Sequence, residues 1–535
     1  MNRTTTRRTF IGLAAAAGLG AAAGVGRLLS AGEAPSGGTA GGAAAASSTA
    51  RASGRARQPP VSEALLPGDT DWPVSNLGAQ HEIEGYAGRA SVLPGESFPL
   101  FVSCQPKWFT VTAYRLGWYR GDGARLVWRS PSLRGGAQRA AAVTGSTSTV
   151  VADWDPVTEV PTDGWPAGAS VLRLDADSGA QRYVPVTVRS SSTAGTVVLK
   201  NCIQTWQAYN TWGGYDLYQG PSGRYDQRSL AVSLDRPYDG NGADMFLTYE
   251  RNAIKLAEHL SATAGLRLSY LASMDIITDP GALAGASALV SMGHDEYWTP
   301  GERATLTVAR DTGVNIAFLG ANAMFRRTRL AATAVGDDRL VVCYKSDYTQ
   351  DPMYGKDPGL VTTDFRADPG ADAESSLTGT LYEGYPVDAS YVVASPSSWV
   401  FAGTGVQAGA GFPHLVGVEY DRVNPGYPLP RPIEVLSHSP LACNGTGSYG
   451  DSAYYTAASG AGVFNSGTMR WVEAIYGDQP HGIGGATPGF VRRVTANVLR
   501  AFADGPAARH YPATDNLDAI REYAGDPVGA PGNLQ

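Results

Sequence analysis

The sequence predicts an α/β protein whose mostly parallel sheet is preceded by an all-β sandwich. Between residues 75 and 195, short β-rich runs recur between Gly, Pro and Asp residues, without long helical periodicity. That spacing is typical of an immunoglobulin-like sandwich. From residue 196, strand-like and helix-like segments alternate, which favours a parallel sheet covered on both faces.

Each expected element follows from its local pattern. Apolar and β-branched runs predict strands and 3.6-residue spacing predicts helices, while Gly265 marks a helix end and Pro300 a helix start. In the β-rich region we expect strands at 98–102, 110–115, 125–128, 170–174 and 183–189. Further along we expect strands at 197–200, 230–234, 266–271, 288–292, 314–319, 339–344, 415–419 and 433–437, and helices at 245–264, 301–312 and 490–503. We interpret the unassigned stretch 346–413 as an insertion beside the site.

Composition and charge limit the function classes. The chain has 535 residues, 43% hydrophobic and 17% charged, which is globular and long enough for two or three domains. Its net charge of −7 is mild and not segregated, so no basic stripe is present to neutralise phosphates and no nucleic-acid partner is expected. The four cysteines form no Cys-x-x-Cys pair, which argues against a structural zinc site.

The N-terminal sequence predicts an export signal. Arg7 and Arg8 stand before Thr-Phe-Ile and a weakly apolar Ala/Gly/Leu run, the pattern of a twin-arginine signal. The run is too short and too poor in apolar residues for a stable membrane span. We therefore expect a secreted, periplasmic or cell-envelope protein, divided into a signal (1–30), a disordered linker (31–74), the sandwich (75–195), the core (196–505) and a tail (506–535).

The block Ser-Met-Gly-His294-Asp-Glu296-Tyr-Trp is the most informative segment. It follows the apolar strand expected at 288–292 and precedes a helix start. Because α/β sheets place ligands at the carboxyl ends of their strands, we expect His294 and Glu296 to face one crevice. Structural roles are the alternative: Glu296 could cap the turn at Thr299, and His294 could satisfy a buried backbone carbonyl.

Several further motifs follow one another in a recognisable order. They are Ala208-Tyr209-Asn-Thr-Trp-Gly-Gly, Leu217-Tyr218, Arg236-Pro-Tyr238, the block around His294, Gly320-Ala-Asn322 and Gly462-Val-Phe-Asn-Ser-Gly-Thr-Met-Arg-Trp471. With Tyr114-Arg-Leu-Gly-Trp118-Tyr119 in the β-rich part, they resemble the large-subunit family of N,N-dimethylformamidase, over about residues 75–505.

This resemblance implies a glutamine-amidotransferase-like α/β core and a mononuclear iron, Fe(III), held by two tyrosinates and one glutamate. By motif, the ligands are Tyr209, Tyr218 and Glu296. If the alignment is displaced, Tyr215, Tyr238 and Tyr249 are the alternatives. The candidate catalytic residues around the metal are His294, Asn322, Lys345 and Glu419.

The implied ligands suit a trivalent iron ion. Phenolate and carboxylate are hard oxygen donors, and three anions balance a trivalent charge. Such an ion polarises an amide carbonyl and acidifies a bound water. His294 would move a proton to the leaving amine, and Asn322 would donate to the oxyanion or orient the substrate.

The chain also departs from the amidase. Asp295 stands where the amidase has a proline, Trp206 where it tends to keep a tyrosine, and the segment from Tyr209 to Tyr218 is far shorter. The resulting hypothesis is an exported, metal-dependent amidohydrolase that cleaves a C–N bond of an unidentified small amide.

Two other functions remain open. A non-catalytic cell-envelope or carbohydrate-binding protein with a degenerate enzyme core could use Trp118, Tyr119 and Trp128 as an aromatic surface. The same fold could also hold a different metal. The sequence does not predict the oligomeric state.

Overall fold

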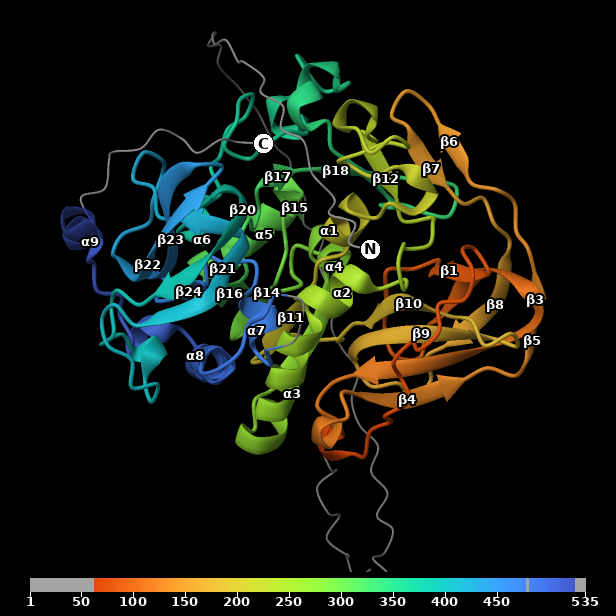
Figure 1. The fold of residues 1–535 in the computed structure, drawn as a ribbon, viewed down its shortest axis with the longest axis horizontal. Helices are drawn as coiled ribbons and strands as arrows, with labels where there is room; N and C mark the ends of the chain where they lie inside the picture. Colours follow the sequence, from red (N-terminus) through yellow and green to blue (C-terminus); the bar gives the residue numbers. More distant parts are fainter. Residues whose placement is uncertain (1–61, 478–480, 525–535) are drawn as a thin grey trace, which may run out of the picture. The chain divides into compact units, whose positions relative to one another are not determined.

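The computed structural model describes residues 62–477 and 481–524 (Figure 1). The expected signal at 1–30, most of the expected linker and the end of the tail lie outside these residues. Within the described part, no helix is both long and apolar enough to cross a membrane.

An eight-stranded sheet organises the β-rich region around the 20-residue strand β3 (Ser97–Leu116). The runs expected at 98–102 and 110–115 are parts of this one strand. Phe98, Leu100 and Val102 alternate along it into one apolar cluster, as a pleated strand requires. The remaining strands of the sheet are β1 (Ile83–Ala87), β2 (Ser91–Val92), β4 (Ala124–Arg129), β5 (Leu133–Gly136), β8 (Pro156–Pro161), β9 (Gly168–Ala176) and β10 (Gln181–Val188).

A seven-stranded sheet organises the rest of the chain, in the order β13-β11-β14-β16-β24-β23-β22. The first five strands in this order run parallel, and β23 pairs antiparallel with both β24 and β22. The strands are β11 (Val197–Asn201), β13 (Leu268–Ala272), β14 (Ala288–Met292), β16 (Asn315–Leu319), β22 (Ile433–Cys443), β23 (Thr446–Thr456) and β24 (Gly462–Asn465).

Helices pack on both faces of this sheet because its side chains alternate. Val197 and Leu199 of β11 share an apolar cluster with α3 and α8, whereas Val198 belongs to the cluster that contains α5. Gly265, in a left-handed conformation, ends α3 where the sequence predicts a helix end, and the side chain of Thr299 caps α5. The helices are α1 (Ile203–Ala208), α2 (Asp244–Tyr249), α3 (Arg251–Ala264), α4 (Ser273–Thr278), α5 (Pro300–Asp311), α6 (Ser375–Thr378), α7 (Trp471–Ala474), α8 (Thr487–Ala503) and α9 (Leu517–Ala524).

Smaller sheets complete the described chain. One has three strands, β12 (Ala231–Ser233), β18 (Arg329–Ala331) and β19 (Leu340–Val342). The two-stranded ones are β15 (Tyr297–Trp298) with β17 (Arg326–Arg327), β20 (Leu381–Val392) with β21 (Gly411–Arg422), and β6 (Ala142–Thr144) with β7 (Thr149–Val151).

The expected fold class, an α/β protein with a glutamine-amidotransferase-like core, is wrong. The structure is mostly strand, 33% against 22% helix, in several sheets with many antiparallel pairs, and it shows no clear core of that kind. Strand–helix alternation is confined to residues 197–319, after which the long antiparallel pairs β20–β21 and β22–β23 dominate. The reason is that an apolar run marks a strand but does not reveal the direction of its partner.

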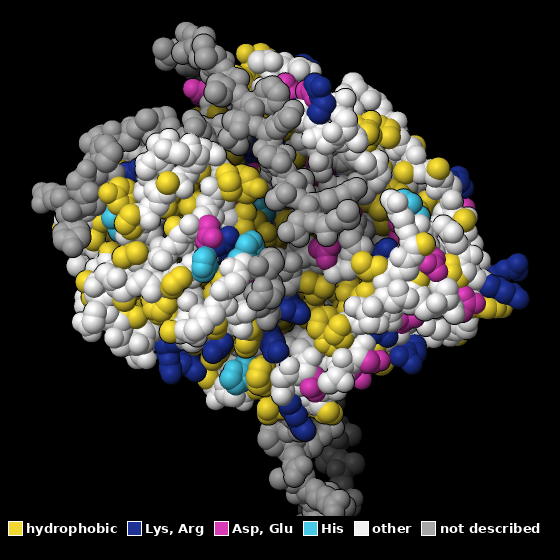
Figure 2. Space-filling view, in the orientation of Figure 1, with side chains coloured by type: hydrophobic (Ala, Val, Ile, Leu, Met, Phe, Trp, Pro, Cys, Tyr) yellow, Lys and Arg dark blue, Asp and Glu magenta, His cyan; other side chains and the backbone are white. Residues whose placement is uncertain are grey.

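The surface shown in Figure 2 carries mixed charge. Lys and Arg side chains occur on this face in small groups, separated by uncharged side chains and by Asp and Glu. This face therefore presents no continuous basic stripe.

Candidate active site

The first tyrosine pair follows α1. Tyr209 is the residue after this short helix, and its N–H still reaches the Thr205 carbonyl at 3.3 Å. The chain then loops back so that Leu217 N–H donates to the Ala208 carbonyl, and the Asp216 carboxylate accepts the Tyr218 N–H at 2.6 Å. These bonds stack the Tyr209 and Tyr218 rings with centroids 4.7 Å apart.

The turn after β14 presents Glu296. Gly293 begins it with φ 57°, and a Cβ there would lie 2.2 Å from the Tyr249 carbonyl oxygen, so only glycine fits. Thr205 Oγ1 accepts the N–H groups of Glu296 (3.1 Å) and Tyr297 (3.2 Å). The turn is therefore fixed directly to α1.

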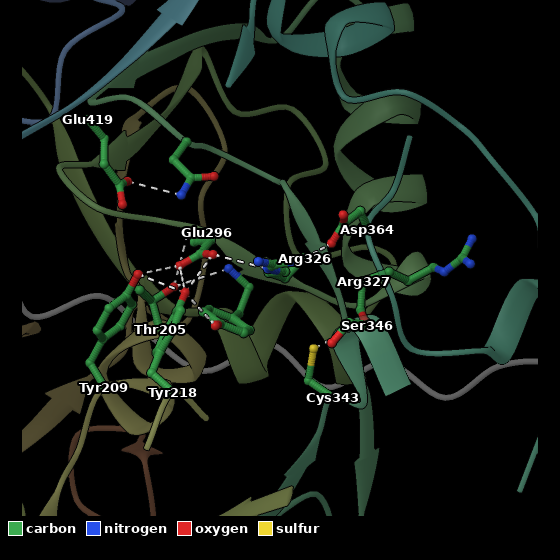
Figure 3. A network of polar contacts seen from close by, with 12 residues as sticks. Thr205, Tyr209, Tyr218, Glu296, Arg326, Arg327, Cys343, Ser346, Asp364 and Glu419 are labelled. Carbon is green, nitrogen blue, oxygen red and sulfur yellow. Dashed lines mark hydrogen bonds and ion pairs between the residues drawn. The ribbon is translucent and has the colours of Figure 1, made fainter. Parts of the chain in front are cut away.

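Three acidic oxygen-bearing side chains converge where these segments meet (Figure 3). Tyr209 Oη lies 2.6 Å from Glu296 Oε2, and Tyr218 Oη lies 2.8 Å from both Glu296 oxygens. The two phenol oxygens are 2.9 Å apart. The structure thus brings together the three residues that the sequence proposed as metal ligands.

The pKa values of the three clustered side chains are shifted in opposite directions. Burial, and then the Glu296 charge, raise the pKa of Tyr209 and of Tyr218 well above the usual 10.0. Burial alone would raise the pKa of Glu296, but His294, Arg326 and Lys345 lower it to about 2. Without a cation, the cluster therefore holds one carboxylate that accepts hydrogen bonds from two neutral phenols.

His294 lies on one side of the cluster. Its Nε2 is 2.9 Å from Tyr209 Oη and 3.5 Å from Glu296 Oε2, and its Nδ1 is 3.7 Å from Glu419 Oε2. Glu419 Oε2 also accepts the Asn322 Nδ2–H at 3.0 Å. His294, Glu419 and Asn322 therefore form a connected group that leads away from the tyrosine oxygens.

Lys345 lies on another side. Its Nζ is 3.2 Å from the centroid of the Tyr218 ring, a cation–π distance, and the residue is 1% exposed. Burial and the nearby Arg326 lower the pKa of Lys345 well below its usual value, against the opposing effect of Glu296. Asn322 (φ 59°) and Lys345 (φ 55°) both have left-handed backbone, which costs energy outside glycine and is found preferentially at functional sites.

Three residues of the site were not predicted from the sequence: Arg326, Tyr297 and Thr205. Arg326 Nε is 3.4 Å from Glu296 Oε1, and the Arg326 guanidinium also pairs with Asp364. Tyr297 Oη donates to Tyr218 Oη at 2.8 Å. Tyr297 stands inside the conspicuous block and could have been noticed, whereas Arg326 and Thr205 carry no local signal.

Asp295 faces away from the cluster into a second buried network. Lys200 Nζ lies 2.8 Å from Asp295 Oδ2, 2.5 Å from Glu302 Oε1 and 3.2 Å from the Trp298 ring centroid. Ser291 Oγ donates to Asp295 at 2.6 Å. Asp295, which stands where the amidase has a proline, is thus paired with Lys200 on β11. This network anchors the turn that carries His294 and Glu296.

The alternative tyrosines contact other side chains. Tyr238 packs edge-on against Trp206, and Tyr215 packs against the apolar cluster around Trp212. The Tyr249 ring lies 5.7 Å from the His294 ring, so this tyrosine borders the histidine instead.

The aromatic residues of the alternative binding surface are buried or packed against other rings. Tyr119 is 0% exposed, and Trp118 packs on His259 with ring centroids 4.3 Å apart. Trp128 lies 6.4 Å from Trp165. They do not form one exposed platform.

Metal sites of the common kind are not found in the described ranges. No group of three or more His, Cys, Asp or Glu side chains there is placed to hold a metal ion. The Tyr–Tyr–Glu cluster belongs to a different donor class, because two of its three members are phenols.

The site is a cluster of two tyrosines and one glutamate beside a histidine, and a comparison with protein families identifies its relatives. The model of the family described as "N,N-dimethylformamidase beta subunit-like, C-terminal" matches residues 110–482, so this chain belongs to that family. Membership confirms the resemblance and suggests a function related to amidohydrolases.

Comparisons with curated proteins and with solved structures do not identify a function. No curated protein matches the sequence significantly. A solved structure of a Paenibacillus sp. cycloisomaltooligosaccharide glucanotransferase complexed with cycloisomaltoheptaose shares 10% sequence identity and covers 48% of this chain, with a TM-score of 0.14. This chain spans 33% of that protein, and the similarity is too low to support any conclusion.

Proposed function

We propose that this protein is a metal-dependent amidohydrolase that binds one iron ion, as Fe(III), and cleaves the C–N bond of a small amide. The observation that carries the proposal is the convergence of Tyr209 Oη, Tyr218 Oη and Glu296 Oε2 within 2.9 Å of one another. The family membership supports an amide as the substrate class.

The residues present fit a hard trivalent cation. Oxygens that bind one ion at about 2 Å lie about 3 Å apart, close to the separations in this cluster. Tyr209 and Tyr218 have pKa values raised by burial and by Glu296, so they would ionise only if a cation replaced their protons. Two phenolates and one carboxylate would then hold the ion.

The bound ion would polarise the amide carbonyl and acidify a water molecule. The chain's own residues would do the rest. Glu296 is kept ionised by His294 and Arg326, so it needs no proton release to bind. His294 is placed to carry a proton to the departing nitrogen, and Glu419 Oε2 lies 3.7 Å from its other ring nitrogen. Lys345 is a buried donor for the carbonyl oxygen.

The binding-protein alternative has less support. It needs an exposed aromatic surface, and Tyr119 is buried while Trp118 packs on His259. It also leaves the Tyr–Tyr–Glu cluster without a role.

Metal analysis and a visible spectrum test the proposal. We expect about one iron per chain and a tyrosinate-to-iron absorption band, together with release of amine from small amides. The Tyr218→Phe variant should lose the band and the activity, and Tyr238→Phe is the matched control because Tyr238 is likewise partly buried and packs against Trp206. A correctly folded, colourless, metal-free protein would refute the proposal.

We also propose export through the twin-arginine pathway, on the basis of Arg7 and Arg8. Replacing both with Lys should retain the protein in the cytoplasm. Unchanged export would contradict this route.

A further inference from the structure

The loop that joins the two proposed tyrosine ligands is closed at its base. Tyr209 and Tyr218 stand nine positions apart in the chain. The Leu217 N–H donates to the Ala208 carbonyl at 3.0 Å, and this bond brings together the residues that precede the two tyrosines. The 2.9 Å separation of the phenol oxygens therefore depends on what holds the backbone of this loop.

A buried arginine, Arg236, spans the loop. Its Nη1 donates to the Trp212 carbonyl at 3.0 Å and to the Tyr215 carbonyl at 2.8 Å. Its Nη2 donates to the Gln207 carbonyl at 3.3 Å. These three carbonyls come from the beginning, the middle and the end of the loop, so one guanidinium links all of its parts.

Two of the three carbonyls lie beside the proposed ligands. Gln207 is two positions before Tyr209, and Tyr215 is three positions before Tyr218. Directly after Tyr215, the Asp216 carboxylate accepts the Tyr218 N–H at 2.6 Å. The guanidinium therefore fixes the backbone from which each tyrosine side chain starts.

Backbone and amide oxygens satisfy this buried cation. Arg236 is 0% exposed, and its hydrogen bonds within the described part of the chain go to the three carbonyls and to Gln207 Oε1 at 3.4 Å. Burial lowers the pKa of Arg236 to about 10, against the opposing effects of Asp216 and Asp239, so the group stays charged at neutral pH. Because a guanidinium presents its donors in a rigid planar fork, it specifies where the carbonyls lie.

We infer that Arg236 is a positioning residue for the proposed metal site, whose fork holds the loop so that Tyr209 and Tyr218 present their phenol oxygens to one ion. This inference rests on the proposed function and adds a residue that acts on the ligands through the backbone. The loop is thereby arranged before the ion arrives, and iron binding does not have to order it.

Iron affinity and amide exchange test the inference in the full-length protein. Arg236→Lys keeps a positive charge, but an ammonium donates from a single point and does not reproduce the fork. We expect iron affinity to weaken about 10- to 100-fold in a chelator competition, with a shifted or weakened tyrosinate-to-iron band. In the metal-free variant, hydrogen exchange at the amides of Leu217 and Tyr218 should accelerate at least about 10-fold.

A buried arginine of the β-rich region is the matched control. Arg115 of β3 is 4% exposed and also donates to backbone carbonyls, those of Leu116 at 3.3 Å and Ala167 at 2.9 Å. Arg115→Lys should lower the thermal midpoint but leave the iron affinity, the absorption band and the exchange of residues 209–218 at their wild-type values. All measurements are made below the thermal midpoint of each variant.

The wild-type protein supplies a test that needs no variant. In its metal-free form, the amides of Leu217 and Tyr218 should already be protected from exchange, and iron should add little protection. A loop that becomes protected only when iron binds would overturn the inference, even if Arg236→Lys did not fold.

The other failures are distinguishable. If folded Arg236→Lys has the iron affinity and the spectrum of the wild type, the inference is overturned and the proposed function stands. An equal loss of affinity in Arg115→Lys also overturns it, because the effect would then follow general stability. If the wild-type protein binds no iron, the proposed function fails and the inference fails with it.

Discussion

Two buried clusters of charge lie on opposite sides of one turn. On one side, Lys200 sits between Asp295 and Glu302, within 2.8 Å of both carboxylates. On the other, Glu296 contacts Tyr209 and Tyr218, and Arg326 Nε lies 3.4 Å from Glu296 Oε1. Neighbouring residues of the chain therefore serve two differently balanced sites.

The difference lies in the source of positive charge. The Lys200 network contains its own cation in direct contact, which identifies it as structural. The Glu296 cluster has three potential anions packed together, and Arg326 pairs with Glu296 alone. Acidic groups in excess of the cations paired with them are therefore the better indication of a metal site.

Removing a proposed ligand should have the largest effect. Glu296→Gln is expected to abolish iron binding and to lower kcat at least 10⁴-fold, about 5 kcal/mol in the activation free energy. Asp295→Asn is the control, because it alters the adjacent residue but should keep the iron absorption band. Full metal content in Glu296→Gln would remove the distinction between the two clusters.

Removing the internal cation should mainly affect stability. Lys200→Met leaves two carboxyl groups in the interior without their partner, so the free energy of unfolding should fall by about 3–5 kcal/mol. Denaturant titration measures it. Arg224→Met, which breaks only the exposed pair with Asp226, should cause no measurable change. Equal stability of Lys200→Met and wild type would show that the network is not structural.

The same network should make stability depend on pH. Burial raises the pKa of Glu302 from 4.5 to about 7, although Lys200 opposes this. The folded protein then binds more protons than the unfolded chain between these values. Stability should therefore fall as pH rises from about 4.5 to 7, by up to about 3 kcal/mol. In Glu302→Gln the decrease of stability between about pH 4.5 and 7 should disappear. An unchanged decrease would show that other groups cause it.

The smallest expected effect concerns a residue that touches a ligand. Tyr297→Phe removes the hydroxyl that donates to Tyr218 Oη at 2.8 Å. Iron affinity should weaken about 10-fold, or 1.4 kcal/mol, in a competition titration with a chelator. Tyr238→Phe should bind iron like the wild type. Unchanged affinity in Tyr297→Phe would show that this hydroxyl does not support the metal ligand.

The sequence predicted local elements better than their assembly. The strand β14 has the bounds expected for it, and the helix at Pro300 begins where its proline and Thr299 cap place it. The fold class was wrong because β20 and β21 pair antiparallel within a stretch that carried no usable pattern. Strand propensity is local, but pairing direction depends on contacts between distant segments.

For the site, family motifs selected residues that the fold brings together, but not the residues that hold them. Tyr209 and Tyr218 stand 87 and 78 positions before Glu296, and only motif order connected them. Arg326 and Thr205 were missed because an arginine after a strand, or a threonine in a short helix, gives no sign of its distant partner.

By itself, the sequence determined the bounds of β14, the end of α3 at Gly265 and the His294–Glu296 block, because these follow from neighbouring residues. The tertiary structure alone decided that Asp295 turns toward Lys200 while Glu296 turns toward the tyrosines. The physical reason is that a buried charge is costly unless it is paired or hydrogen-bonded, and its partner comes from another segment of the chain.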